Sequence, residues 1–278
     1  MLDFLKRFAG NRGAVIGALL LVVTLLLAIF SPMLYPQSPW AIAQRPFLEP
    51  FTTEGYLMGT DTLGRNVASG LAHGAYISLL IGLISTLVSL AIGIPLGACA
   101  GYFGGWVDDI LMRVTEFFQV IPTFAFAVVL VAILQPSLTS IITAIALVSW
   151  PPVARLLRGE VLALKSREFI EAAQLSGQSS TTIILRQIMP NTLSPVVVMS
   201  SMMIATAILT ESALSFMGLG DPEIMSWGYM VGAGRTVIRQ AWWISFFPGL
   251  AILLTVLAFN LIGEGLNDAL NPRLRKRG

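Results

Sequence analysis

Long uncharged apolar stretches alternate with short polar segments along the chain. Five long stretches carry no charged residue, and they lie between Arg12 and Arg45, Arg65 and Asp108, Glu116 and Arg155, Arg186 and Glu211, and Arg239 and Glu264. A charge at the centre of a membrane helix costs about 2.5–3.5 kcal/mol, so such gaps mark membrane spans of about 20 residues each. The third gap is long enough for two spans, which Gln135-Pro136-Ser137 would separate. The pattern predicts six transmembrane helices, over residues 14–34, 76–100, 114–134, 138–155, 192–218 and 243–263.

Basic residues indicate the orientation of these spans. Only four of the 17 lysines and arginines fall in the segments on one side, namely Arg45, Arg65, Arg235 and Arg239. The others, including Lys6, Arg113 and the C-terminal group Arg273, Arg275, Lys276 and Arg277, fall on the opposite side. The positive-inside rule then places both termini in the cytoplasm. The first apolar run is longer than the core of a signal peptide, which favours a membrane anchor.

The spans divide the chain into three regions. These are an N-terminal tail with the first span (residues 1–34), an extracytoplasmic segment (35–75) and a five-helix core (76–278). Four prolines in the extracytoplasmic segment disfavour a packed helix there. The segment ends in a turn-rich polar motif containing Asp61 and Arg65. These residues either solvate a surface loop or pair with each other, or they form a docking edge for an extracytoplasmic partner.

Composition excludes several classes of protein. Hydrophobic residues make up 55% of the chain and charged residues 12%, which is far from the composition of a soluble domain. A net charge of +2 is too small to indicate a nucleic-acid-binding protein. Cys99 and His73 are the only residues of their types, so no disulfide or Cys/His zinc site can form within the chain. The phosphate-binding loop of P-loop ATPases is absent, and we expect no catalytic residues and no metal site.

The cytoplasmic segment 155–190 is charged but has helical patterning. At 100° per residue, Phe169, Ala172, Ala173 and Ser176 share one face. Gly177 suits the left-handed position after a helix end, and Ser179 or Ser180 can cap a second short helix. That second helix would carry an apolar stripe and would be separated from the fifth span by Pro190; the stripe is Ile184, Leu185, Ile188 and Met189. The segment predicts a helix-turn-helix outside the membrane, and the alternative is an amphipathic loop lying on anionic lipid.

The chain resembles a known transporter family in this segment. Glu171-Ala172-Ala173, Gly177 and Ile188-Met189-Pro190 resemble the EAA loop of ATP-binding-cassette importer permeases, although the patterned Ile falls on Gln187 and the patterned Leu is Met189. Further motifs resemble the dipeptide/oligopeptide subfamily, and they begin at Gly59, Tyr102, Arg155, Arg167, Ala213, Ser226, Phe247 and Ala258. The chain is most similar to the second, shorter permease of the pair that forms the pore.

This resemblance implies a type I importer in the cytoplasmic membrane of a bacterium or archaeon. The partners would be a second homologous permease, two ATPases that bind ATP and Mg, and an extracytoplasmic substrate-binding protein, with lipid around the complex. The helix before Gly177 would be the coupling helix that contacts an ATPase. Glu171, Ala172, Ala173, Gly177, Ile188, Met189 and Pro190 would form this coupling site, and no cofactor would be bound by the permease itself.

The sequence does not identify the substrate-binding residues, and three groups of residues within the spans each have two possible roles. Glu211 lies near the outer end of its span, where it either bonds to neighbouring groups or contributes to a gate or a contact for a peptide amino group. Gly93, Gly97 and Gly101 form a small-residue stripe that permits close helix packing, within the bundle or at the seam between permeases. Met202, Met203 and Met217 either line a permissive cavity or are ordinary core or lipid-facing residues.

Two other functions compete with the importer. A self-contained ion-coupled secondary transporter would show deep ionisable residues and inverted repeats, and neither is visible. A membrane enzyme would need a base for its serines, and none is evident. The resemblance leaves the cargo open among dipeptides, oligopeptides, glutathione, nickel chelates, opines and other small solutes.

Overall fold

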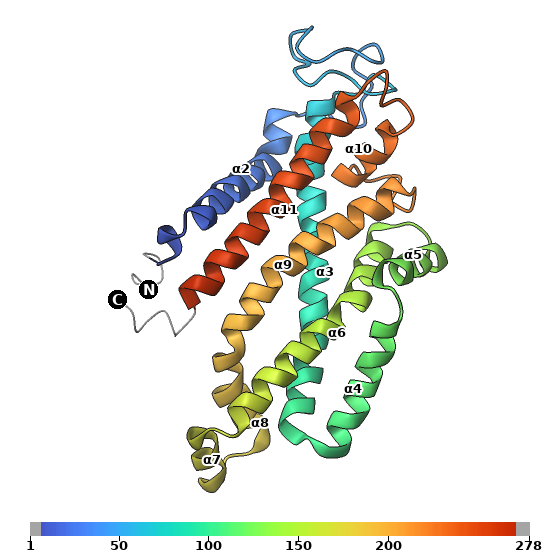
Figure 1. Ribbon diagram of the computed structural model, residues 1–278. Coiled ribbons are helices and arrows are strands. Elements are labelled where there is room, and N and C mark those ends of the chain that lie inside the picture. Colours follow the sequence, from blue (N-terminus) through green and yellow to red (C-terminus); the bar gives the residue numbers. More distant parts are fainter. Residues whose placement is uncertain (1–6, 271–278) are drawn as a thin grey trace.

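A computed structural model describes residues 7–270 (Figure 1). The described residues are predominantly helical and form no sheet; two isolated β-bridges lie in the outer segment. The elements are α2 (Arg12–Leu34), α3 (Val67–Phe103), α4 (Gly105–Val120), α5 (Thr123–Leu134), α6 (Leu138–Lys165), α7 (Glu168–Leu175), α8 (Ser180–Thr182), the π-helix η1 (Ile183–Ile188), α9 (Met189–Phe216), α10 (Trp227–Gly234) and α11 (Trp243–Leu270).

Five helices are long and apolar enough to cross a membrane, and the bent pair α4–α5 makes a sixth candidate. The predicted all-α membrane architecture is confirmed. α3 lies at the centre and contacts α2, α4, α6, α9, α10 and α11 (Figure 1). Buried side chains form one cluster around Trp227 and Trp243 near the outer end, one between α3, α5, α6 and α9, and one around Leu157 and Ile170 at the cytoplasmic end.

The second span begins earlier than predicted. α3 starts at Val67, whereas the apolar pattern places the start at residue 76. Asn66 caps the helix, because its side-chain oxygen accepts hydrogen bonds from the backbone N–H groups of Ala68 and Ser69. The first turns of α3 contain Ser69 and His73, which lowered the apolar signal although most of this part of the helix is buried. Residues 67–75 therefore belong to the helix and not to an outer loop.

The third span is broken, and its prediction as one helix over residues 114–134 is wrong. α4 and α5 meet at an angle of 85° at Ile121 and Pro122. Ile121 adopts extended dihedral angles, as residues before proline generally do, because the proline ring disfavours the helical conformation there. The predicted turn at Gln135-Pro136-Ser137 is confirmed, and Ser137 caps α6 by accepting a hydrogen bond from the N–H of Ser140.

The two ends of the described chain lie together. Asn11, the cap of α2, donates a side-chain hydrogen bond of 2.9 Å to Asp268 near the end of α11. α2 and α11 pack along each other (Figure 1). This pairing agrees with an even number of spans. Lys6 and the predicted cytoplasmic residues Arg273, Arg275, Lys276 and Arg277 lie outside the described residues.

The outer segment folds over the end of the bundle without a helix. Residues 35–66, all of which are described, form turns, bends and two isolated bridges. Trp243 of α11 donates its indole N–H to the backbone oxygen of Thr60 at 3.0 Å, which fastens the segment to the bundle. The proline-based prediction of an irregular outer segment is confirmed.

Candidate functional site

The predicted cytoplasmic helix before Gly177 is α7. Its residues Ile170 and Ala173 are buried in the cluster that also contains Leu157, Ile183 and Ile188. These contacts hold α7 against the cytoplasmic end of α6 and against η1. The buried line runs through Ile170 and Ala173, next to the predicted face, while Ala172 and Phe169 remain exposed.

The outward face of α7 is free within the described chain. Glu171 and Ala172 are exposed, and 91% of the Leu175 side chain is accessible to solvent. A leucine this exposed on a helix that is anchored from behind offers an apolar contact to another surface. The segment therefore presents a rigid, short helix with small and apolar residues outward.

Gly177 ends α7 in the predicted left-handed conformation. Its φ angle is +75°, and its N–H donates to the carbonyl of Gln174. The N–H of Gln178 reaches the carbonyl of Ala173, which completes a Schellman motif. A side chain at residue 177 would meet no neighbour within 4 Å, so backbone conformation is the reason for glycine.

The residues after Gly177 differ from the prediction. Ser179 caps the next helix as expected, but residues 183–188 form a π-helix that continues directly into α9. Pro190 therefore does not separate a short helix from the fifth span, and that expectation is wrong. Pro190 has no N–H, and its ring would clash with the carbonyl of Arg186 in a regular α-helix, so the wider π turn accommodates it.

The π turn also changes which residues face inward. Ile183 and Ile188 are fully buried, whereas Leu185 is 62% exposed. The expected stripe through Ile184, Leu185, Ile188 and Met189 is therefore only partly correct. The extra residue in the turn rotates the stripe relative to an α-helix.

An ion pair that the sequence reasoning missed connects α4 to α6. The guanidinium of Arg158 donates two hydrogen bonds of 2.5 Å to the two carboxylate oxygens of Asp108. Asp108 and Arg158 belong to two of the family motifs, and the predicted topology puts both on the cytoplasmic side. Their common location on the cytoplasmic side was the one feature of the sequence that could have predicted this ion pair.

Two hollows lie beside α6. A pocket of about 360 Å³ at the cytoplasmic ends of α4 and α6 contains six charged residues: Asp108, Asp109, Arg113, Glu116, Arg155 and Arg158. A groove of about 370 Å³ lies deeper in the bundle, between the α4–α5 break, α6 and α9. Met202 and Met203 line this groove, as the cavity interpretation anticipated, and Met199, Thr206 and Thr210 extend it. Met217, the third methionine of that interpretation, is exposed and is not among the lining residues.

Glu211 lies inside the protein near the outer end of α9. It is 1% exposed, and its carboxylate accepts hydrogen bonds from Ser226 at 2.6 Å and from Ser215 at 2.8 Å. Ser226 caps α10, so the carboxylate ties α10 to α9. The bonding interpretation accounts for these contacts, and a role in substrate binding stays a prediction.

Asp61 and Arg65 form an ion pair of 2.6 Å in the outer segment. Asp61 also accepts hydrogen bonds from the backbone N–H groups of Leu63 and Arg65, and the guanidinium of Arg65 lies 5.0 Å from the centre of the Trp40 ring. Arg65 is 6% exposed. The pair thus holds the outer segment in shape, and its role in docking a partner stays a prediction.

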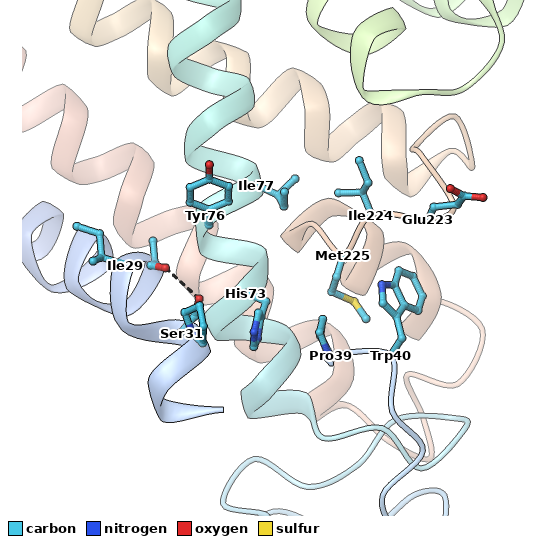
Figure 2. A pocket seen from close by; sticks show the side chains of 12 residues that line it. Ile29, Ser31, Pro39, Trp40, His73, Tyr76, Ile77, Glu223, Ile224 and Met225 are labelled. Atoms are coloured by element: carbon cyan, nitrogen blue, oxygen red, sulfur yellow. Dashed lines mark hydrogen bonds between the residues drawn. The ribbon is translucent and has the colours of Figure 1, made fainter. Parts of the chain in front are cut away.

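A further cavity of about 600 Å³ lies at the outer end of the bundle, between α2, α3 and the segments that precede α3 and α10 (Figure 2). Its lining is mostly apolar, with Ile29, Ile77 and Met225 around it. Figure 2 also shows His73 at this cavity, and one ring nitrogen of His73 lies 3.0 Å from the backbone oxygen of Ser69. Within residues 7–270, no cluster of His, Cys, Asp and Glu could hold a metal ion.

The chain matches two families. Residues 93–276 match the family described as the binding-protein-dependent transport system inner membrane component. Residues 1–50 match the N-terminal transmembrane domain of oligopeptide transport permease C. The first match covers most of the chain, including the coupling segment, the charged pocket and the groove.

Individual relatives match almost the whole chain. The di/tripeptide transport system permease protein DppC of Pseudomonas aeruginosa is 40% identical over 98% of this chain and 92% of its own length. The oligopeptide permease OppC of Escherichia coli K12 is 39% identical over 98% and 91%, and the glutathione permease GsiD of Pectobacterium atrosepticum is 38% identical over 98% and 91%.

A solved structure supports the fold. An inward-facing form of the methionine ABC transporter MetNI aligns with a TM-score of 0.56 at 16% identity, over 71% of this chain and 96% of that one. These findings contradict a self-contained secondary transporter, and they assign nucleotide binding to partner ATPases. The chain belongs to the binding-protein-dependent inner membrane permeases of ABC importers, in the group of OppC- and DppC-type second permeases.

Proposed function

We propose that this chain forms half of a pore that imports small peptides. A second homologous permease forms the other half, two ATPases bind ATP and Mg in the cytoplasm, and an extracytoplasmic binding protein delivers the cargo. Peptide cargo is supported by the names of the relatives, which specify di/tripeptides, dipeptides, oligopeptides or glutathione.

Coupling to the ATPases would occur at α7. The observation that carries this role is the combination of a buried inner face with an exposed outer face on one short helix, ending at Gly177. Ala172 and Leu175 would contact the ATPase, and Glu171 would add a polar contact. Ile188, Met189 and Pro190 would support α7 from the base of α9. Movement of the ATPases would then shift this end of the bundle as a rigid unit.

A glycine substitution tests the coupling role. Gly177→Asp would force an L-residue into the left-handed region at a cost of about 1–2 kcal/mol, and would put a charge beside the ATPase contact. We expect the complex to assemble while peptide uptake falls at least tenfold and ATP hydrolysis no longer responds to loaded binding protein. Uptake and hydrolysis would be measured in proteoliposomes.

Gly55→Asp is the matched control. Gly55 also has a positive φ, of +83°, and open space around it, but it lies in the outer segment. The control should retain coupling. Normal uptake by Gly177→Asp, or equal loss in both variants, would contradict the assignment.

Partners and cargo are tested by purification and transport. Tagged chain extracted in mild detergent should bring a second permease and two ATPase copies, identified by mass spectrometry. Recovery of the chain alone in several mild detergents would refute the proposed assembly. Uptake of labelled trialanine by the complete importer, with its binding protein added, tests the peptide cargo directly.

A further inference from the structure

The charged pocket and the groove are two separate hollows that both border α6. On α6, Ser149 and Pro152 line the groove, and Arg155 and Arg158 follow at the same spacing of three residues and line the pocket. Each step of three residues turns the side-chain direction by about 60°, so Ser149 and Arg158 point about 180° apart and the two hollows lie on different sides of α6. Opposite α6, Glu116 of α4 lines the pocket, whereas Thr123 and Phe124 of α5 line the groove.

The groove suits side chains of varied shape. Met199, Met202 and Met203 come from one face of α9, and 55% of the Met202 side chain is exposed. Methionine is flexible and polarizable, so it adapts to different apolar groups. Thr206 and Thr210 on the same face add hydroxyl groups that can accept hydrogen bonds from a peptide backbone.

The pocket carries balanced and largely unpaired charge. It contains three acids and three arginines. Asp108 and Arg158 pair with each other, and this is one of two ion pairs within residues 7–270. Asp109, Glu116, Arg113 and Arg155 line the same pocket without an ion-pair partner in that part of the chain. A purely anionic or cationic ligand would meet as many like charges as opposite ones, whereas a zwitterion finds a partner for each end.

We infer that the imported peptide contacts the groove, and that the charged pocket then binds its two termini before release into the cytoplasm. The guanidinium of Arg155 or Arg113 can hold the terminal carboxylate through two parallel hydrogen bonds. Glu116 or Asp109 accepts hydrogen bonds from the terminal ammonium group. Both hollows are about the size of small-ligand sites. This inference rests on the proposed function, because it assumes a peptide pore.

Protection of a single cysteine tests binding in the pocket. In a Cys99→Ala background, Met112→Cys places a thiol in the pocket lining. Its reaction with a maleimide would be followed in inside-out vesicles containing the complete importer, with and without trialanine. Occupancy slows the reaction by a factor of 1 + [L]/Kd, so trialanine at about ten times its Kd should slow it about tenfold. N-acetyl-trialanine amide, which has no charged terminus, should not protect.

Four variants localise the effect. Arg155→Gln and Glu116→Gln, which remove unpaired charges from the pocket, should abolish protection. Arg12→Gln and Glu264→Gln are the controls, because both residues are exposed near the cytoplasmic ends of other helices, and protection should persist in them. In all four variants, the thiol at residue 112 should react at the same rate as in the parent protein when trialanine is absent.

Each negative outcome of these experiments leads to a different conclusion. Unchanged reaction rates with trialanine, or equal protection by the uncharged peptide, would overturn the inference even where trialanine uptake is normal. Slow modification that ignores the peptide and is relieved by removing the ATPases would identify the pocket as an ATPase contact instead. Absence of trialanine uptake by the unaltered importer would refute the proposed cargo itself.

Discussion

Glu211 shows how one buried carboxylate can organise the outer end of the bundle. Its oxygens satisfy hydroxyl groups of Ser215 on its own helix and of Ser226 at the start of α10. Ser226 in turn accepts the N–H of Tyr229, so the network continues into α10. The groups depend on one another, because each would otherwise be a buried polar atom without a partner.

Removing this carboxylate should destabilise the protein. We expect Glu211→Ala to lower stability by about 1–3 kcal/mol, because buried hydroxyl groups lose their acceptor. The midpoint of thermal unfolding in detergent would be compared with that of Glu223→Ala, an exposed acid close to α10. Equal midpoints for the two variants would contradict the structural role of Glu211.

At this scale, local sequence predicts well where partners are close in the chain. Gly177 follows from the helix pattern before it, and the Asp61–Arg65 pair spans only four residues. Ser226 is 15 residues from Glu211 and belongs to another helix, so no local pattern indicates their contact. The sequence therefore located the acid near the outer surface but did not reveal its partners.

At the scale of elements, the glycine stripe of α3 packs inside the bundle. A Cβ on Gly93 would lie 2.6 Å from the Cβ of Val153, and one on Gly97 would collide with the carbonyl oxygen of Ala154. Val153 and Ala154 belong to α6, which has the most extensive contact with α3. Of the two interpretations of the stripe, packing within the bundle is the correct one.

Two glycine-to-alanine variants separate packing from helix propensity. Gly97→Ala should destabilise the protein by about 1–3 kcal/mol, because the methyl group overfills the α3–α6 contact. Gly159→Ala lies on α6 with no neighbour within 4 Å, and it should stabilise its helix by up to about 1 kcal/mol. Thermal unfolding midpoints should therefore move in opposite directions. A stabilised Gly97→Ala would show that the two helices pack less closely than described.

Charge gaps predict where the helices exist but not where they change direction. Hydropathy stays high across Ile121 and Pro122, so the 85° break was invisible to it. A proline alone does not decide the matter, since Pro195 and Pro248 lie within the continuous helices α9 and α11. Similarly, Pro190 does not interrupt the helix, because the preceding π turn accommodates its ring. Backbone context, which composition does not encode, determines the outcome at each proline.

At the scale of the molecule, the pairing of helices creates the candidate site. The methionines of α9 line the groove together with residues of α5 and α6, and the arginines of α6 line the charged pocket together with residues of α4, although these helices are separated in the sequence. Hydropathy identifies an apolar segment without indicating its neighbour. The coupling segment could be predicted because its motif is contiguous, whereas the groove and the charged pocket could not, because separate helices line them.

The orientation of the whole bundle is open to a direct test. The positive-inside rule places α7 in the cytoplasm and residues 35–66 outside. In a Cys99→Ala background, Phe51→Cys should react with a membrane-impermeant maleimide on intact spheroplasts, since Phe51 is 76% exposed. Leu175→Cys, in chain expressed without its ATPases, should react only in inverted membranes. The reverse labelling pattern would invert the topology and move α7, with its exposed leucine, to the side where no ATPase could reach it.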